Sequence, residues 1–328
     1  MAYVLGVDAG NRQTFALIAD DEGYILGAGR RGCGNTSNPH LPEEVALKHV
    51  EQAVGEALEL AQLDAYDLSC ACMGMAGAIW PEDFSFLKRH FSKKLGAQEL
   101  LITNQAFGAL RAASLEGHGL AIMGGIEVVS AVKDGLGQSW YSGYWQQGLG
   151  SEALGRQVLE SIREIGLGIE VASSLGTRLC EVLKLDSLED LLHAFYNRRK
   201  EAPLSLYQLA PFLIEEADKG DKLCQSLLKR HGERLGQYVL AALKKSALAE
   251  DVLISLSGDL FRLRSKLLYE ALLDKVKTAY PQANMVYAEL EAVVGGVMGG
   301  LEHHLHHPIT AEIFSKLKST SPDSSFFC

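Results

Sequence analysis

The feature that most constrains the fold is a pattern of three short apolar segments near the N-terminus that begins again near residue 119. In the first copy, residues 3–8, 14–19 and 24–29 are apolar and are separated by turns rich in glycine or acidic residues. Short apolar runs with turn signals between them are typical of antiparallel strands in a meander. Segments with the periodicity of helices and buried strands follow each copy. The sequence therefore predicts an α/β chain with an internal duplication at the level of the fold.

The length of 328 residues favours two domains, because it exceeds what one hydrophobic core usually serves. We expect an N-terminal domain over residues 1–117 and a C-terminal domain over 118–305. The second domain is expected to contain a helical insertion at about 151–248 and to end in a helix over 292–304. Residues 306–328 are rich in Ser and Lys and predict a loosely held polar tail.

Composition excludes several classes of function. The net charge of −10, without a basic patch to offset it, argues against a nucleic-acid partner. No run approaches 18 apolar residues, so we expect no membrane span, and the N-terminus lacks the basic region of a signal peptide. Six cysteines without framework spacing favour reduced thiols and a cytoplasmic protein.

Three clusters of chemically active residues are first interpreted as structural. Cys70 and Cys72 are expected to share one strand face as buried thiols rather than as a metal site. The histidine tract is expected at a helix end, where cations suit the helix dipole, and an aromatic cluster is expected to pack between strands. The tract consists of His303, His304, His306 and His307, and the aromatic cluster of Trp140, Tyr141, Tyr144 and Trp145.

Two turns have the composition of phosphate-binding loops. Asp8 and Gly10 follow the first strand of the first meander, and Gly124 and Gly125 follow the first strand of the second. Glycine lets backbone N–H groups approach an anion, and a nearby acid can hold Mg²⁺ through water. Either turn alone is weak evidence, since Asp and Gly are common in turns of every kind.

The order and spacing of the motifs are more specific. The series D-A-G-N-R-Q-T, N-T-S-N-P-H, A-G-A, I-T-N-Q-A, M-G-G-I-E, G-Y-W-Q-Q-G-L-G-S-E, S-G-D-L-F and V-V-G-G-V-M-G-G resembles the N-acetylglucosamine kinase / BadF/BadG/BcrA/BcrD-type ATPase family over residues 1 to about 305. The resemblance implies two actin-like (ribonuclease H-like) domains around an interdomain cleft. It also implies ATP and Mg²⁺ as cofactors and a sugar-like small molecule as substrate.

The resemblance assigns roles residue by residue. The ATP-binding residues are Gly10, Asn11, Arg12, Thr14, Gly125, Ile126, Glu127, Gly258 and Asp259, of which several depart from the family's letters. The substrate-binding residues are Asn38, Gly77, Ala78 and Trp145. Asp8 is the acid that holds Mg²⁺ through water. Gln105 stands where the family's T-D-A-A segment has the aspartate base, and Glu152 is the first candidate to replace that base.

The departures predict weakened or lost phosphoryl transfer. Glutamine accepts no proton at neutral pH, and loss of a positioned base typically costs about 10²–10⁴ in rate. Glu127 places a carboxylate where polyphosphate should lie, while Ile126 and Val128 replace two hydroxyl donors of the family's G-T-G-S motif. Arg12 has two interpretations: it binds phosphate, or it pairs with Glu127 across the cleft and closes the site.

Three functions are consistent with this pattern. The first is ATP-dependent phosphorylation of an amino sugar or a similar hydroxyl substrate. The second is a catalytically silent relative that binds a sugar or nucleotide as a sensor or structural subunit. The third is an ATPase that activates a partner enzyme, although the paired cluster cysteines of such activators are not evident. A homodimer is a further expectation.

Overall fold

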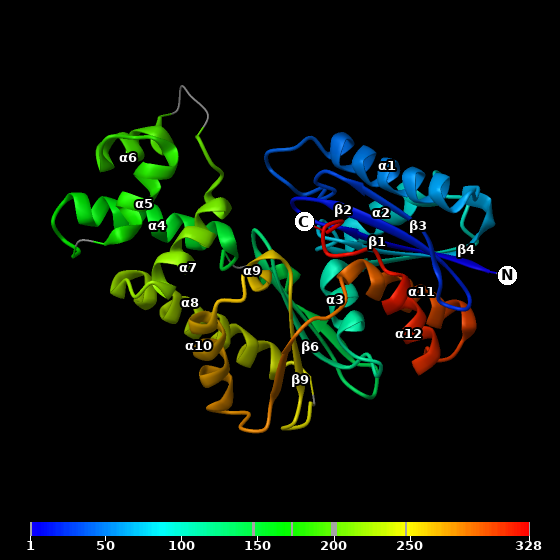
Figure 1. The fold of residues 1–328 in the computed structure, drawn as a ribbon. Coiled ribbons are helices and arrows are strands. Elements are labelled where there is room, and N and C mark those ends of the chain that lie inside the picture. The colour runs from blue at the N-terminus through cyan, green and yellow to red at the C-terminus, as the bar shows by residue number, and fades with distance from the viewer. Residues whose placement is uncertain (1, 146–147, 172, 198–201, 247, 328) are drawn as a thin grey trace.

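The computed structural model describes residues 2–145, 148–171, 173–197, 202–246 and 248–327. Two five-stranded sheets form the centres of two lobes, with helices packed on them (Figure 1). Each sheet has three antiparallel strands followed by two parallel ones, so the two sheets share one topology. The internal duplication and the two-domain α/β fold predicted from the sequence are therefore confirmed.

The first sheet has the strand order β3-β2-β1-β4-β5. Its strands are β1 (Tyr3–Ala9), β2 (Thr14–Asp20), β3 (Ile25–Arg31), β4 (Leu68–Met75) and β5 (Glu99–Asn104). Its helices are α1 (Glu43–Ala61), α2 (Pro81–Ser92) and α3 (Gln105–Ala113), with a short 3-10 turn, η1, at Ala65–Asp67. The carboxyl ends of the parallel strands β1, β4 and β5 lie at one edge, because Asp8 is paired with Gly74 and Gly74 with Thr103.

The second sheet has the strand order β10-β9-β6-β7-β8. Its strands are β6 (Gly119–Gly124), β7 (Val128–Lys133), β8 (Ser139–Tyr141), β9 (Leu253–Ser257) and β10 (Asn284–Tyr287). The predicted helical insertion is present as α4 (Ser151–Gly166), α5 (Ser174–Leu183), α6 (Leu188–Tyr196), α7 (Ala210–Asp218) and α8 (Lys222–Leu243), with 3-10 turns η2 (Gly143–Trp145) and η3 (Leu206–Leu209). Helices α9 (Asp259–Arg262) and α10 (Lys266–Lys277) lie between β9 and β10.

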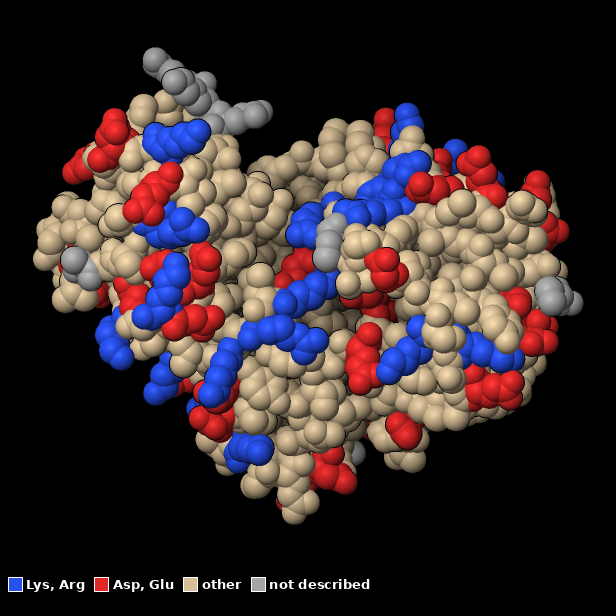
Figure 2. Space-filling view, viewed as in Figure 1, with Lys and Arg blue, Asp and Glu red and all other residues tan. Residues whose placement is uncertain are grey.

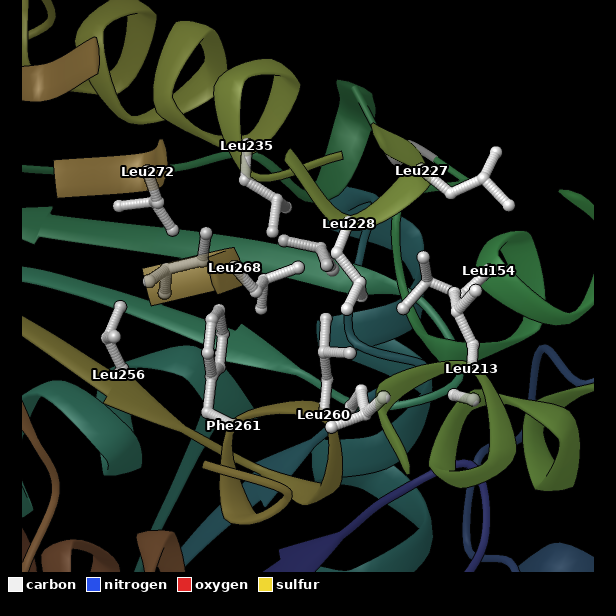
Figure 3. Packing of buried hydrophobic residues seen from close by; sticks show 14 of the residues in the cluster. Leu154, Leu213, Leu227, Leu228, Leu235, Leu256, Leu260, Phe261, Leu268 and Leu272 are labelled. Atoms are coloured by element: carbon white, nitrogen blue, oxygen red, sulfur yellow. The ribbon is translucent and has the colours of Figure 1, made fainter. Parts of the chain in front are cut away.

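Leucines from α8 and α10 form much of the second core (Figure 3). Leu228, Leu235 and Leu272 are fully buried between these helices and the sheet. The helices approach to backbone contact at Gly232, where a Cβ would lie 2.5 Å from the carbonyl oxygen of Leu268. Burial of a leucine side chain stabilises a fold by about 1.5–3 kcal/mol, so this core anchors α8 firmly on the sheet.

The last helix of the duplicated unit, α11 (Ala292–Leu305), returns to the first lobe. We expected it within the second domain, yet it packs against β1, β4 and α3. The glycines of its V-V-G-G-V-M-G-G segment permit this close approach: a Cβ on Gly295 would lie 1.8 Å from the carbonyl oxygen of Gly108. The division of the chain at residue 117 stays a prediction.

The expectation of a loosely held tail is wrong. Residues 311–320 form α12 (Ala311–Thr320), and Ile309, Leu317 and Phe327 are buried against the first lobe. Their apolar side chains are few and widely spaced among Ser and Lys, which is why composition alone suggested a solvated segment. Ring packing of Phe327 on Phe15, with centroids 5.2 Å apart, fixes the end of the chain on β2.

Phe327→Ala should lower the free energy of unfolding by about 3 kcal/mol, because truncating a buried aromatic leaves a cavity. Urea titration of both proteins measures the difference. Ser324→Ala, three residues earlier and exposed, is the matched control and should change the free energy by less than about 0.5 kcal/mol. An equally small effect of both substitutions would contradict the packing of the C-terminal segment.

Candidate active site

A small hollow of about 80 Å³ lies where the two lobes meet, and we call it the cleft. It is lined from the first lobe by Asp8, Gly10, Asn11, Arg12, Gln13, Phe15 and Gln105, and from the remainder of the chain by Met123, Gly125, Ile126, Glu127, Gly258, Asp259, Arg262 and Glu291. Figure 2 shows acidic and basic side chains close together where the two lobes meet. The two turns with phosphate-loop composition thus line one site.

Asp8 is the buried acid of the cleft. Its side chain comes from the carboxyl end of β1, and its Oδ1 has no hydrogen-bond partner among the residues that the structure describes. Burial, followed by the nearby Glu291 carboxylate, raises the pKa of Asp8 to about 7; Arg262 opposes this shift and Asp259 adds to it. A buried carboxylate without a partner is costly, so the site favours a proton or a cation at this position.

Gln105 begins α3 and meets the first turn of the cleft. A Cβ on Gly10 would lie 3.6 Å from Gln105 Oε1, and this oxygen is buried without a hydrogen-bond partner in the described part of the chain. The turn is held by a 2.9 Å bond from Gly10 N to Gln13 O. Two unpartnered oxygens, one from an acid and one from an amide, therefore lie at the same edge of the first sheet.

The second turn of the cleft is fastened to the start of α4. Gly125 N donates to Glu127 O at 2.9 Å, while Ser151 donates to Gly125 O from both its N–H and its Oγ, at 2.9 and 3.0 Å. Glu127 is exposed, yet nearby protein atoms remove part of the water around its carboxylate, and this desolvation, followed by the Glu152 carboxylate, raises its pKa. Val128 faces the other way into the second core, so its lack of a hydroxyl does not bear on the cleft.

Arg12 pairs with Asp259 rather than with Glu127, which was the partner named in the second of its two interpretations. Arg12 Nη1 lies 3.2 Å from Asp259 Oδ2 and joins the first turn to α9. The reason is the backbone at Gly258, whose φ of +87° and contact with the Gly124 carbonyl bring the next residue over the cleft.

Arg262 extends this ion pair into a network. It lies 2.7 Å from Asp259 and 2.5 Å from Glu291, and it donates to the carbonyl oxygen of Phe327 at 3.1 Å. Arg30 on β3 donates to the neighbouring carbonyl of Phe326 at 2.9 Å. The C-terminal segment is therefore bound by guanidinium groups from both lobes beside the cleft.

Thr14 and Asn38 lie outside the cleft. The Thr14 hydroxyl is buried and donates to the Gly32 carbonyl at 2.9 Å, which makes it a structural contact between the start of β2 and the end of β3. Asn38 Nδ2 lies 3.5 Å from Cys33 Sγ, in a loop beside the site.

The asparagine of that loop that contacts a residue of the cleft is Asn35, which we did not predict from the sequence. Asn35 is buried and donates to Asn11 Oδ1 at 2.6 Å. The same loop packs on the A-G-A turn, because a Cβ on Gly77 would lie 2.4 Å from Thr36 Oγ1. Ala78 accepts a 3.0 Å bond from Asn104 Nδ2, so this turn is tied to the residue before Gln105.

The other two predicted residues lie beyond the second turn. Glu152 forms an exposed i,i+4 ion pair with Arg156 at 2.8 Å. Its backbone N–H donates to Ile126 O at 3.4 Å, and its carboxylate lies close enough to Glu127 to raise the pKa of that group. Trp145 is 62% exposed and lines a separate hollow. Within the expected aromatic cluster, Tyr141 and Tyr144 pack on each other with ring centroids 5.5 Å apart, but the expectation that Trp145 packs in the core is wrong.

The cysteine pair is buried and the histidine tract lies at the end of α11, as the sequence predicts. Cys70 and Cys72 are buried on the face of β4 that α11 covers, and burial raises the pKa of both thiols, to about 11 and about 12. His303 pairs with Glu99. Within the described ranges, no group of three or more His, Cys, Asp or Glu side chains is arranged to hold a metal ion. Those ranges also contain no helix with the length and apolar character that a membrane crossing requires.

Sequence reasoning missed Arg262 and Glu291. Arg262 ends the four-residue helix that starts at Asp259, so the spacing of Asp and Arg at i and i+3 was an available signal. Glu291 precedes an almost wholly apolar helix, where a carboxylate suits the helix N-terminus. Nothing in the sequence indicated that Phe15 lines the cleft. Every residue of β2 is buried, so the pattern of apolar residues does not show which side chain reaches the cleft.

The topology and the paired turns define a two-domain protein of the actin-like ATPase fold. A family profile matches residues 5–300, and the chain belongs to the BadF/BadG/BcrA/BcrD ATPase family. It is 24% identical over 311 residues to an N-acetyl-D-glucosamine kinase of Dictyostelium discoideum, covering 90% of this chain and 96% of the relative.

Two further comparisons agree with this assignment. The chain is 23% identical to an N-acetylmuramic acid/N-acetylglucosamine kinase of Clostridium acetobutylicum, with 91% and 98% coverage. The solved structure of a Chromobacterium violaceum protein, provisionally assigned as an N-acetylglucosamine kinase, superposes with a TM-score of 0.68 at 18% identity, covering 90% of this chain and 98% of that one. The fold predicted from the sequence is thus shared over nearly the whole of each chain.

Asp8→Asn should remove a pH-dependent penalty on folding. The unfolded acid has a pKa near 3.8 and the folded one a pKa of about 7, so between these values the native state holds a proton that the unfolded state releases. Wild-type stability should therefore fall, relative to the variant, as the pH rises from 4 to 7, by up to about 4 kcal/mol. Urea titrations of both proteins at several pH values measure this difference, and parallel curves would refute the shifted pKa.

Proposed function

We propose that this chain binds Mg²⁺-ATP and an amino sugar in the cleft and transfers the phosphoryl group only slowly. The observation that carries the proposal is the position of Gln105. This residue directly follows β5 and lines the cleft with Asp8 and Gly10, and its Oε1 is buried without a partner among the described residues. Family membership and the amino-sugar kinases among its relatives support the substrate class. The fold supports ATP as the nucleotide.

The donor set of the cleft suits a magnesium nucleotide. Asp8 offers a buried carboxylate oxygen without a partner, which is the ligand type that Mg²⁺ takes when most of its other ligands are water and phosphate. Bound Mg²⁺ would supply charge neutralisation for the phosphates. Gly10 and Gly125 line the cleft, one from each lobe, and without side chains they let an anion come close to the backbone of the two turns, although their own N–H groups donate within the turns.

Gln105 is suited to position a sugar hydroxyl but not to deprotonate it. An amide oxygen accepts a hydrogen bond and, unlike a carboxylate, takes no proton at neutral pH. Asn35 and the turn at Gly77 support this side of the site through their packing on each other and on Asn11. The exposed Glu127 carboxylate on the opposite turn repels phosphate, which weakens nucleotide binding as well.

Binding requires the lobes to separate. The cleft holds about 80 Å³, whereas ligand sites commonly enclose about 300–1,000 Å³. The Arg12–Asp259 pair joins the lobes across the site, and both side chains are about one third exposed. Partly solvated ion pairs contribute little to stability, so breaking this contact costs little free energy.

The Arg12–Asp259 pair also favours a second candidate, a silent relative that binds a ligand without turnover. Asp259 would then neutralise Arg12 in place of a phosphate. The activator hypothesis has no comparable support, since the described cysteines include the buried pair on β4 and no exposed pair. For either candidate we propose a cytoplasmic setting, which supplies Mg²⁺-ATP, and a homodimer remains a proposal without a structural contact behind it.

Restoring the base and the phosphate turn together should increase turnover more than the separate changes predict. Gln105→Asp alone should gain little, since Glu127 still repels phosphate. Ile126→Thr with Glu127→Gly should first strengthen Mg²⁺-ATP binding in calorimetry. Adding Gln105→Asp to that pair should then raise the single-turnover rate with N-acetylglucosamine by about 10²–10⁴. The gain is non-additive because a base acts only on bound substrate.

Gln98→Asp is the matched control, since this exposed residue precedes β5 at its opposite end. It should leave binding and rate unchanged. An acid at position 105 starts α3 and suits the helix N-terminus, so folding should be retained. Rapid phosphorylation of N-acetylglucosamine, glucosamine or N-acetylmuramic acid by the unmodified chain would overturn slow transfer. If calorimetry detects no binding of Mg²⁺-ATP to any of the variants, the proposal of nucleotide binding is overturned.

A further inference from the structure

A second hollow, which we call the aromatic hollow, lies between α8 and the strands β7 and β8. It encloses about 290 Å³. It is lined by Val128, Ser130, Trp140, Ser142, Trp145, Leu149, Tyr238, Ala241, Ala242 and Lys245. The hollow and the cleft share no lining residue, although Val128 of the hollow is next in sequence to Glu127 of the cleft. The hollow is therefore a separate site. Its volume is close to the lower end of the range for small-molecule sites.

Aromatic side chains form several of its walls. Trp140 on β8, Trp145 on η2 and Tyr238 on α8 all line the space. Trp145 is 62% exposed, and Trp140 is half-buried. Large exposed aromatic surface is costly in water, and indole and phenol rings pack best against another planar apolar group. The walls therefore favour a ligand with a planar ring system.

Lysines give the rim of the aromatic hollow a positive charge. Lys245 lines it, with Nζ 5.9 Å from the centre of the Trp140 ring. Lys244 and Lys275 adjoin it in a shallow depression that shares Ala241 and Lys245 with the hollow. None of the three lysines is within ion-pair distance of an acid among the described residues.

The helix dipole explains only part of this charge. Lys244 and Lys245 directly follow the last residue of α8, where cations are favourable, but Lys275 comes from α10. Three lysines at one place, none of them in an ion pair with a described acid, are also unexpected in a chain of net charge −10. An anionic group at the rim would complement all three.

We propose that the aromatic hollow is a binding site for an aromatic anion, a planar ring system carrying a carboxylate, sulfonate or phosphate. The ring lies among Trp140, Trp145 and Tyr238, and the acidic group contacts Lys245. This assignment goes beyond the proposed function and does not depend on it. Val128 and Leu149 line the hollow, and the residues next to them, Glu127 and Gly150, belong to the second turn of the cleft and its link to α4.

Fluorescence titration with 8-anilinonaphthalene-1-sulfonate tests the site directly. Two of the three tryptophans of the chain line the hollow, so bound probe should quench tryptophan emission by energy transfer with a stoichiometry of one. The uncharged analogue N-phenyl-1-naphthylamine is the matched probe without the anion. It should bind at least about tenfold more weakly, the factor expected for losing one charge-assisted contact.

Two exposed positions supply the variants. Lys245→Ala should weaken sulfonate binding about tenfold and leave the neutral probe unaffected. Ala241→Trp should abolish binding of both probes by filling the hollow. Lys229→Ala, on the same helix and exposed but outside the hollow, should change neither affinity. Melting temperatures within a few degrees of wild type show that each variant is folded.

The results separate the parts of the proposal. Equal affinity for the two probes, or an unchanged sulfonate affinity in Lys245→Ala, overturns the assignment of an anion. Undiminished binding to Ala241→Trp overturns the location. Binding of several probe molecules without energy transfer from tryptophan overturns the site altogether.

Discussion

The close contact between α3 and α11 is the constraint on which the rest of the structure depends. Gly108 and Gly295 bring the two helices so near that a single added Cβ would meet a backbone oxygen at 1.8 Å. Because α3 follows β5 and also packs on β6, this contact fixes the first sheet against the second. The carboxyl ends of β1 and β6 then meet above it, and each brings a glycine turn to the cleft. A glycine-poor α11 would hold the lobes apart and separate the two turns.

The same geometry explains the electrostatics of the cleft. Closing the lobes removes water from Asp8 and places it near Glu291, which raises its pKa, while Arg262 provides the compensating cation. Arg262 is in turn held by the C-terminal segment through the Phe327 carbonyl. The last residues of the chain thus help to set the charge of a site built from its first residues. These contacts, and the packing of Phe327 on Phe15, hold the C-terminal segment in place despite its polar composition.

Much of the fold was predictable because its signals are local. The three strands of the first meander, the helical insertion and the helix over 292–304 lie within a few residues of the bounds that the sequence predicts. The prediction of a loose tail was wrong because Leu317 and Phe327 are isolated apolar residues in the sequence, and Phe327 packs on Phe15 near the other end of the chain. The pairing of Arg12 failed for a related reason. Sequence order showed which turns meet, but the left-handed backbone at Gly258 decided that Asp259, and not Glu127, faces the arginine.

Asp8 and Gln105 together decide what chemistry the cleft can perform. Both present a buried oxygen without a partner to the same space, yet only the acid can change its protonation state. With a pKa of about 7, Asp8 is half-protonated near neutrality, and a bound cation would release that proton. Asp8 therefore suits a cation ligand, and it is not free to serve at the same time as base for a sugar hydroxyl. The amide of Gln105 can hold that hydroxyl in place, so the first lobe of the cleft is suited to bind a sugar but has no base at position 105 to deprotonate it.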